Sequence, residues 1–286
     1  MTEFDWGGPT VRRMLVGAQL RRLRTDLGLS RAEAAEAIRA SEWKIHRLEN
    51  GQVRFKERDL ADLLTLYGVT DPDQVEELLV LAADANTPGW WQRYGDVLPV
   101  WFRNYVDLEA AATLIRTYEG QFIPGLLQTD DYVRALVHGA HLEDSNDEVG
   151  RRVRLRMARQ TLLTREQPPR LWAVVDEAAL RRPVGGPEIM RAQLERLLEA
   201  SKLPNVTLQI LGFGAGAHPA MGSSFSILRF PEELPDLVYL EHLTNAVYLD
   251  KRPEVERYLD VMELLCLQSE PPAKTEEFIN RILSEL

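Results

Sequence analysis

Side chains that can contact nucleic-acid bases cluster between residues 41 and 47. They are Ser41, Glu42, Trp43 and Arg47. An arginine can donate two hydrogen bonds to guanine O6 and N7, a glutamate can accept one from cytosine N4, and an indole can touch a thymine methyl group. The segment is therefore a candidate for reading base edges. The alternative roles are structural: Glu42 would cap its own helix, and Trp43 would pack on Ala40.

Cationic and amide side chains flank this segment on both sides. They are Arg31, Lys44, Asn50, Arg54 and Lys56. Such side chains contact phosphate oxygens, which positions a protein on a duplex without reading its sequence. The two sets together predict an interface with double-stranded DNA.

Two short helices must hold these side chains in place. Ser30 followed three residues later by Glu33 is a capping-box pattern, so the first helix is predicted from residue 30 to about residue 39. The second is predicted over residues 41–50, because Asn50-Gly51 is a usual signal for a helix C-terminus.

Small and apolar residues are expected to fix how these two helices cross. Ala35 is small enough for close contact, and Ile45 and Leu48 share the inner face of the second helix. Three more helices are predicted over residues 10–27, 57–67 and 71–85, the last with an N-cap at Asp71 and a first-turn proline. Residues 1–85 should therefore form an all-α domain of five helices, preceded by a loose arm at residues 1–9.

The N-terminal segment resembles the Xre/Cro/phage-repressor class of helix-turn-helix regulators. The matching residues are Leu27-Gly28-Leu29-Ser30, Ala35, Ser41, Ile45, Arg47-Leu48-Glu49 and Asn50-Gly51. The resemblance implies a recognition helix at 41–50 that enters the major groove, and a homodimer on operator DNA with two half-sites. The alternative is a helical bundle that has lost DNA binding or uses its third helix on protein.

Two residues depart from the pattern of that class. Arg31 stands where a glutamine is usual, and Arg39 stands in the turn where a glycine is usual. A non-glycine residue with positive φ costs about 1 kcal/mol, so the turn is tolerable but strained.

The charge distribution agrees with a DNA-binding head on a different kind of body. The whole chain carries a formal charge of −10, but residues 10–70 hold twelve Lys/Arg against eight Asp/Glu. Residues 71–286 hold twenty-two against thirty-four. A mildly basic head on an acidic body is typical of a DNA-binding domain joined to a second domain.

The single cysteine and the N-terminal residues bear on the compartment. Cys266 lies in an apolar run and cannot form an intrachain disulfide or a thiolate zinc cluster. Residues 1–6 lack the basic and apolar regions of a secretory leader, and no uncharged apolar stretch is long enough to span a bilayer. We expect a cytoplasmic protein without membrane contact.

The rest of the chain mixes helix and strand patterns. Residues 86–105 are rich in aromatic residues and indicate a packed connector. Residues 106–286 indicate an α+β domain with a mainly antiparallel sheet, with strands at 171–175, 206–211, 225–230, 237–240 and 246–249, the last two in a hairpin. Helices are expected at 129–138, 148–165, 187–200, 253–268 and 275–285.

A wider resemblance covers nearly the whole chain. The strings at 118–132 and 175–181, together with Trp90-Trp91 and Gly216-Ala217-His218-Pro219, are similar to actinobacterial regulators of the WhiJ and antitoxin-like type. Those proteins join an Xre-class head to a C-terminal domain of unknown function. The resemblance implies a regulator and, as a partner, a small acidic protein of the BldB type.

Polar residues around the predicted strands are candidates for an effector or partner pocket. They are Glu119, Gln128, Asp176, Glu177 and Glu241. Glu241 ends an apolar strand, where a buried carboxylate needs a partner. That partner is either an internal arginine such as Arg116 or a small-molecule or peptide effector.

No pattern in the second domain predicts an enzyme, a cofactor or a metal site. His138 and His141 lie near Glu143 and Asp144, which is only weakly typical of metal ligands. The glycine-rich run 212–216 precedes a proline and a strand, whereas a phosphate cradle needs a following helix. The arginine-rich stretch 151–159 is interpreted as a salt-bridged helix, with docking of an acidic partner or extra DNA contact as alternatives.

Three functions from different classes follow from these patterns. The first is a sequence-specific transcriptional regulator whose C-terminal domain binds an effector or a partner. The second is an antitoxin-like interaction module that binds DNA weakly or only with its partner. The third, an enzyme that carries a helix-turn-helix domain, lacks a catalytic constellation in the sequence.

Overall fold

A computed structural model describes residues 9–87, 89–140, 142–231 and 234–286. The chain divides into two compact units. Unit 1 holds residues up to Arg93 together with Asn104–Ala111 and Pro231–Leu234, and unit 2 holds Tyr94–Arg103, Ala112–Phe230 and Pro235–Leu286. The residues of the predicted N-terminal arm, except for Pro9, lie outside the described ranges.

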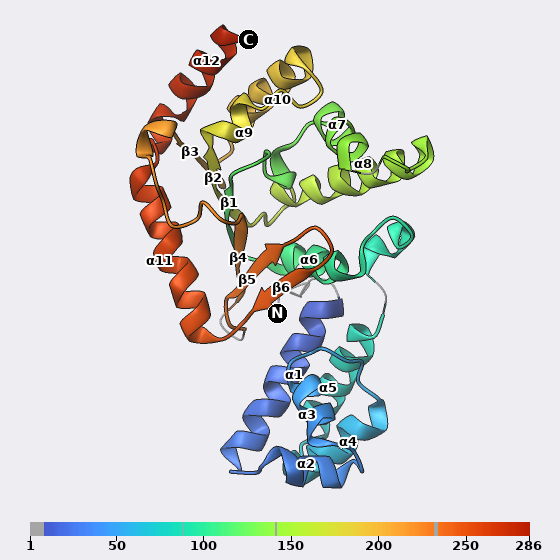
Figure 1. Cartoon of the computed structure of the whole chain (residues 1–286). Coiled ribbons are helices and arrows are strands. Elements are labelled where there is room, and N and C mark those ends of the chain that lie inside the picture. The colour runs from blue at the N-terminus through green and yellow to red at the C-terminus, as the bar shows by residue number, and fades with distance from the viewer. Residues whose placement is uncertain (1–8, 88, 141, 232–233) are drawn as a thin grey trace. The chain divides into compact units, whose positions relative to one another are not determined.

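Unit 1 begins with five helices, as the sequence predicts. Within the described part of residues 9–87 they are α1 (Pro9–Asp26), α2 (Arg31–Ala37), α3 (Glu42–Glu49), α4 (Glu57–Leu66) and α5 (Pro72–Ala85) (Figure 1). The capping box of Ser30 and Glu33 is formed, and Asp71 caps α5 with Pro72 in its first turn. Apolar residues of all five helices build one core, which includes Leu20, Ala35, Leu48, Leu63 and Leu78.

The turn between α2 and α3 contains a strained residue. Arg39 has φ 51°, and it is the one non-glycine residue with positive φ in the described chain. The sequence predicts this strain, because a glycine is usual in that turn. The unfavourable φ reverses the chain between two helices that pack closely.

The aromatic stretch after α5 contains helical structure that the sequence analysis treats only as a connector. Trp90–Tyr94 form a 3₁₀ helix, η1, and α6 spans Val100–Ala111. Within unit 1, the buried carboxylate of Asp107 accepts hydrogen bonds from the Thr10 hydroxyl (2.8 Å) and the Trp91 indole (2.7 Å). This carboxylate therefore ties the start of α1 to α6 and η1.

A six-stranded sheet forms the centre of unit 2 in the described part of the chain. In sheet order the strands are β3 (Val206–Leu211), β2 (Arg170–Asp176), β1 (Leu114–Glu119), β4 (Phe225–Arg229), β5 (Leu237–Glu241) and β6 (Ala246–Leu249). The β1–β4, β4–β5 and β5–β6 pairs are antiparallel, whereas β1–β2 and β2–β3 are parallel. The mainly antiparallel α+β expectation and the hairpin of the last two strands are confirmed.

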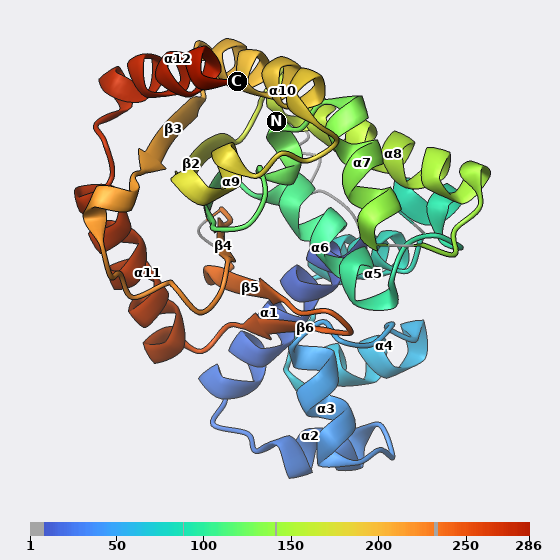
Figure 2. The ribbon, with the colours of Figure 1, turned by 45° about the horizontal axis from the view of Figure 1, so that its top comes forward.

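The helices of unit 2 cover the two faces of this sheet. They are α7 (Asp130–Ala140), α8 (Asn146–Gln160), α9 (Glu177–Arg181), α10 (Pro187–Ala200), α11 (Arg252–Gln268) and α12 (Thr275–Glu285). Figures 1 and 2 show α11 along one side of the sheet and α7 with α8 on the other. Apolar residues of α11 and of the sheet form a common core that includes Val238, Met262 and Leu265.

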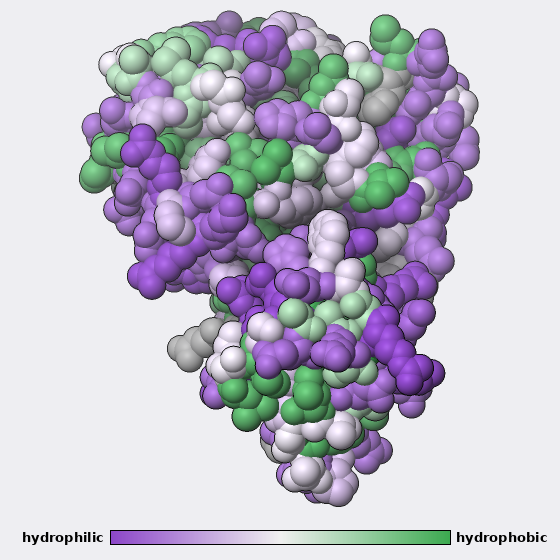
Figure 3. Space-filling model, turned by 60° about the horizontal axis from the view of Figure 1, so that its bottom comes forward, coloured by the Kyte–Doolittle hydropathy of each residue, from purple (hydrophilic) through white to green (hydrophobic). Residues whose placement is uncertain are grey.

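Figure 3 shows hydrophilic residues over much of the face turned to the viewer, with hydrophobic patches among them. Among the described residues, no helix combines the length and the apolar character needed to cross a membrane.

Candidate nucleic-acid interface and the polar groups of the sheet

The crossing of α2 and α3 is built from the residues that the sequence analysis selects. Ala35 is buried on α2, and Ile45 and Leu48 are each 1% exposed on the inner face of α3. The Ser41 hydroxyl caps α3 by accepting a hydrogen bond from the Lys44 backbone N–H at 3.3 Å. This cap gives Ser41 a structural role. Ser41 is also exposed, so the predicted base contact is compatible with the cap.

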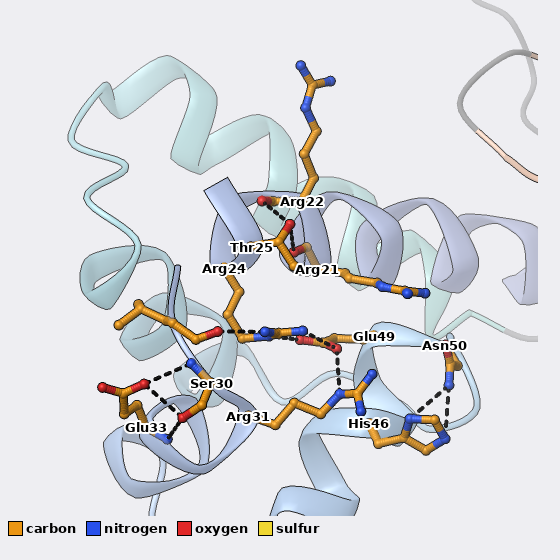
Figure 4. A network of polar contacts seen from close by, with 11 residues as sticks. Arg21, Arg22, Arg24, Thr25, Ser30, Arg31, Glu33, His46, Glu49 and Asn50 are labelled. Atoms are coloured by element: carbon orange, nitrogen blue, oxygen red, sulfur yellow. Dashed lines mark hydrogen bonds and ion pairs between the residues drawn. The ribbon is translucent and has the colours of Figure 1, made fainter. Parts of the chain in front are cut away.

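A buried ionic network anchors the C-terminal end of α3. Glu49 accepts hydrogen bonds from Arg24 Nε (2.5 Å) and Nη2 (3.1 Å), and from Arg31 Nε (3.2 Å) (Figure 4). The side chains of Arg24 and Glu49 are 8% and 2% exposed, whereas that of Arg31 is 38% exposed. The hydrogen bond to Glu49 raises the pKa of Arg24. One carboxylate thus connects α1, α2 and α3.

The outer face of α3 presents an aromatic and cationic cluster. Trp43 is 59% exposed, and the Arg47 guanidinium carbon lies 5.3 Å from the centroid of its ring. The His46 ring centroid is 5.7 Å from that of Trp43, and the Asn50 amide nitrogen contacts the His46 ring nitrogens at 3.2 and 3.3 Å. Glu42 and Arg47 are also exposed. The exposed side chains of Glu42, Trp43 and Arg47 are therefore accessible to a partner as large as a DNA duplex.

The predicted phosphate-binding residues divide into engaged and exposed side chains. Arg31 is bonded to Glu49, and Lys44 Nζ lies 2.5 Å from Asp59 Oδ2 on α4. Arg54 and Lys56 are exposed in the segment between α3 and α4. Arg54 and Lys56 are therefore better placed to bind a DNA phosphate than Arg31 and Lys44, whose charges are already paired with Glu49 and Asp59.

The predicted pocket residues of unit 2 do not form one site. In a sheet, residues in register point to the same face, and side chains alternate along a strand. The β1–β4–β5 register places Glu119 and Glu241 on one face, and it places Asp176 of β2 on the other. Arg156 connects Gln128 to Glu119. Its Nη1 donates to the Gln128 side-chain oxygen at 3.0 Å, and its charge lowers the pKa of Glu119.

Glu119 is an unusual carboxylic acid on its face of the sheet. Its Oε2 atom is buried and has no hydrogen-bond partner among the described residues. The pKa of Glu119 is raised to about 8: burial is the main cause and the charge of Glu241 adds to it, while the Ser224 hydroxyl and Arg156 oppose the rise. Glu119 is therefore largely protonated at neutral pH.

The expected internal partnership of Arg116 and Glu241 is wrong. Arg116 is in register with Ile227, which is in register with Val238, three residues before Glu241, so the two side chains point to opposite faces. Glu241 is exposed rather than buried, so it has no need of an internal counter-charge.

Asp176 and Glu177 serve the local structure at the end of β2. Asp176 caps α9 through the Ala178 backbone N–H at 2.8 Å. Glu177 bonds Arg181 at 2.6 Å and accepts from the Phe213 backbone N–H at 2.9 Å. Both carboxylates thus have internal partners.

A cluster that the sequence analysis missed adjoins Asp176. His218 Nε2 lies 3.4 Å from the Tyr118 hydroxyl and 3.8 Å from Asp176 Oδ2, and its Nδ1 is buried without a described partner. One feature of the sequence points to this cluster: His218 and Tyr118 both lie in the segments that carry the wider resemblance. Their separation by 100 residues hid the contact.

The remaining sequence candidates have simple structural roles. The arginine-rich stretch lies on α8, where Arg151 pairs with Asp96, Arg152 with Asp144 and Arg154 with Asp147. Among the residues that the structure describes, no cluster of three or more histidine, cysteine or carboxylate residues could hold a metal ion. The candidate His141 lies outside the described residues.

Comparison with protein families assigns both parts of the chain. Residues 15–78 match a family described as a helix-turn-helix domain, and residues 102–281 match a family described as a domain of unknown function (DUF5753). The second match covers more than half of the chain, so the protein belongs to the DUF5753 family. No curated protein and no solved structure is significantly similar to it. The helix-turn-helix match supports a DNA-binding regulator.

Proposed function

We propose that the protein is a sequence-specific transcriptional regulator in which α3 enters the major groove of operator DNA. The observation that carries this proposal is the exposed Trp43–Arg47 pair on a helix whose inner face and C-terminal end are firmly held. Arg47 is the residue best suited to guanine, because an arginine fork matches guanine O6 and N7.

The surroundings of α3 suit this role. Arg54 and Lys56 follow α3 and are exposed, so they are placed to contact phosphates beside the groove. Residues 10–70 also carry excess positive charge. A homodimer would place two copies of α3 on two half-sites, which increases both affinity and specificity.

In this proposal the C-terminal unit binds an effector or a partner protein and transmits its presence to the DNA-binding unit. The support is the set of incompletely satisfied polar groups that its sheet carries, notably Glu119 and His218. Buried polar atoms without partners are uncommon in folded proteins, and a ligand is one way to satisfy them.

A second candidate is an antitoxin-like module that binds DNA weakly alone and tightly with a small acidic partner of the BldB type. The observation in its favour is that Arg31 and Lys44 are already paired with Glu49 and Asp59. These two cations would contribute less to phosphate binding than their positions suggest.

The experiment is a binding titration of the purified full chain with its own upstream DNA and with a scrambled duplex, at two salt concentrations. The regulator predicts tight, salt-dependent binding that discriminates against the scrambled duplex. Weak and indiscriminate binding would contradict it. Recovery of tight binding on addition of a small acidic protein of the BldB type would then support the antitoxin-like module.

A further inference from the structure

The face of the sheet beneath α11 contains an open groove of about 320 Å³. It is lined by Arg116 of β1, Trp172 of β2, and Glu263, Cys266 and Leu267 of α11. This volume lies at the lower end of the range for small-molecule sites. The groove lies on the opposite face of the sheet from Glu119 and Glu241.

Arg116 has no direct ion-pair partner among the described residues, although the carboxylate of Glu263 lines the same groove. Its Nε atom is buried without a hydrogen-bond partner, and its guanidinium forms no ion pair with a described residue. Its guanidinium carbon lies 5.6 Å from the centroid of the Trp172 ring. A buried guanidinium N–H without an acceptor is unfavourable, and a ligand carboxylate that bonds the guanidinium would relieve this cost.

Trp172 forms a fixed aromatic wall beside this cation. Its indole N–H donates to the Gln209 side-chain oxygen at 2.8 Å. Gln209 in turn donates to the backbone carbonyls of Cys266 (3.2 Å) and Glu270 (3.0 Å). The indole is therefore held in orientation before any ligand arrives, which reduces the entropy lost on binding.

The other wall restricts the charge that the groove accepts. Leu267 is 81% exposed at the groove and offers an apolar contact. Burial raises the pKa of the Cys266 thiol, so that side chain is uncharged at neutral pH. Glu263 is the carboxylate among the lining residues, and it would repel a second negative charge on a ligand.

From these contacts we propose that the groove binds a small monocarboxylate with a planar apolar body. The carboxylate accepts hydrogen bonds from Arg116, and the planar body lies against Trp172 and Leu267. Glu263 disfavours polyanions such as phosphate esters. This inference deepens the proposed effector role of the C-terminal unit and rests on that role for its biological meaning.

The test measures binding without DNA, so that its failure is distinct from failure of DNA binding. Phenylacetate and indole-3-acetate are titrated by calorimetry against the full chain, beside indole-3-acetamide as the neutral counterpart. We expect saturable binding of at least one acid, and at least tenfold weaker binding of the amide.

Three variants locate the site. Arg116→Gln should weaken binding of the acid at least tenfold and leave the melting temperature undiminished, since the arginine has no internal ion pair. The control Arg252→Gln removes an exposed arginine that is paired with Glu256, and it should change affinity less than twofold. Glu263→Gln alters an exposed residue and should tighten binding by removing a like charge.

The affinities of the three variants decide whether the groove binds the acid. Selective loss in Arg116→Gln with a gain in Glu263→Gln supports the site. Absence of saturable binding of both acids up to about 1 mM, a range in which even weak specific ligands are detected, overturns it. Equal binding to the wild type and to Arg116→Gln overturns it as well.

Discussion

The carboxylate of Glu49 accepts hydrogen bonds from two guanidinium nitrogens of Arg24 in the interior of the helix-turn-helix unit, at 2.5 and 3.1 Å. Glu49 is the last residue of α3, and Arg24 lies near the end of α1. The pair therefore fixes the orientation of α3, and with it the direction in which Trp43 and Arg47 project. Arg24 also donates to the Leu29 carbonyl at 2.6 Å, which ties the segment before α2 to the same centre.

Glu49→Gln should destabilise unit 1 by roughly 3 kcal/mol, because it leaves the buried Arg24 without its counter-charge. Chemical denaturation followed by far-ultraviolet circular dichroism measures this loss. The control is Asp26→Asn, which breaks a pair with Arg22 whose side chains are 77% and 68% exposed. It should cost less than about 0.5 kcal/mol. Equal stability of Glu49→Gln and the wild type would refute the anchoring role.

Arg39→Gly should stabilise unit 1 by about 1 kcal/mol, because glycine adopts the positive φ of this turn without steric cost. Arg39→Ala is the matched control: it removes the same charge but keeps the Cβ atom, and should give no comparable gain. Thermal denaturation compares the two. A stabilisation that is equal in both variants would attribute the effect to charge rather than to backbone strain.

Glu119→Gln should become more stable relative to the wild type as pH rises from 5 to 8. The folded-state pKa of about 8 exceeds the ordinary value of 4.5, so the folded wild type retains a proton that the unfolded chain loses. The stability of the wild type therefore falls with rising pH over that window, at no more than about 1.4 kcal/mol per pH unit, and glutamine removes this dependence.

The measurement is the free energy of unfolding of both proteins at pH 5, 6, 7 and 8. We expect the difference to grow by roughly 3 kcal/mol in favour of Glu119→Gln, as follows from a pKa that rises from 4.5 in the unfolded chain to about 8 in the folded protein. A difference that is independent of pH would show that Glu119 titrates normally.

Arg54→Ala should reduce the slope of log K against log salt concentration by about 1, and weaken binding similarly on specific and scrambled DNA. Lys44→Ala should have a smaller effect on the slope, because Asp59 already neutralises Lys44. Binding isotherms at several salt concentrations give both slopes. The reverse order would mean that the Lys44–Asp59 pair opens on DNA.

The sequence predicts the DNA-binding unit well because its signals are local. The capping box at Ser30, the N-cap at Asp71 and the spacing of Ile45 and Leu48 all act within one or two helical turns, and each is formed. Even the strain at Arg39 follows from the residue type at one position.

The sequence predicts unit 2 less completely because its decisive contacts are distant. Strand β1 was missed since its six residues, Leu-Ile-Arg-Thr-Tyr-Glu, include two charged ones, although it is central in the sheet. Without β1 the register is unknown, so the faces of Glu119, Asp176 and Arg116 could not be assigned. The proposed pocket consequently mixed residues from both faces.

The most direct test of the central claim is selection of binding sites from a randomised duplex pool by the wild type and by Arg47→Ala. The account predicts that the wild type enriches one motif and that Arg47→Ala enriches the same motif with specificity relaxed at one base pair, equivalent to about 1–3 kcal/mol. Identical motifs from both proteins would contradict base reading by Arg47, and failure of the wild type to enrich any motif would contradict sequence-specific binding by α3.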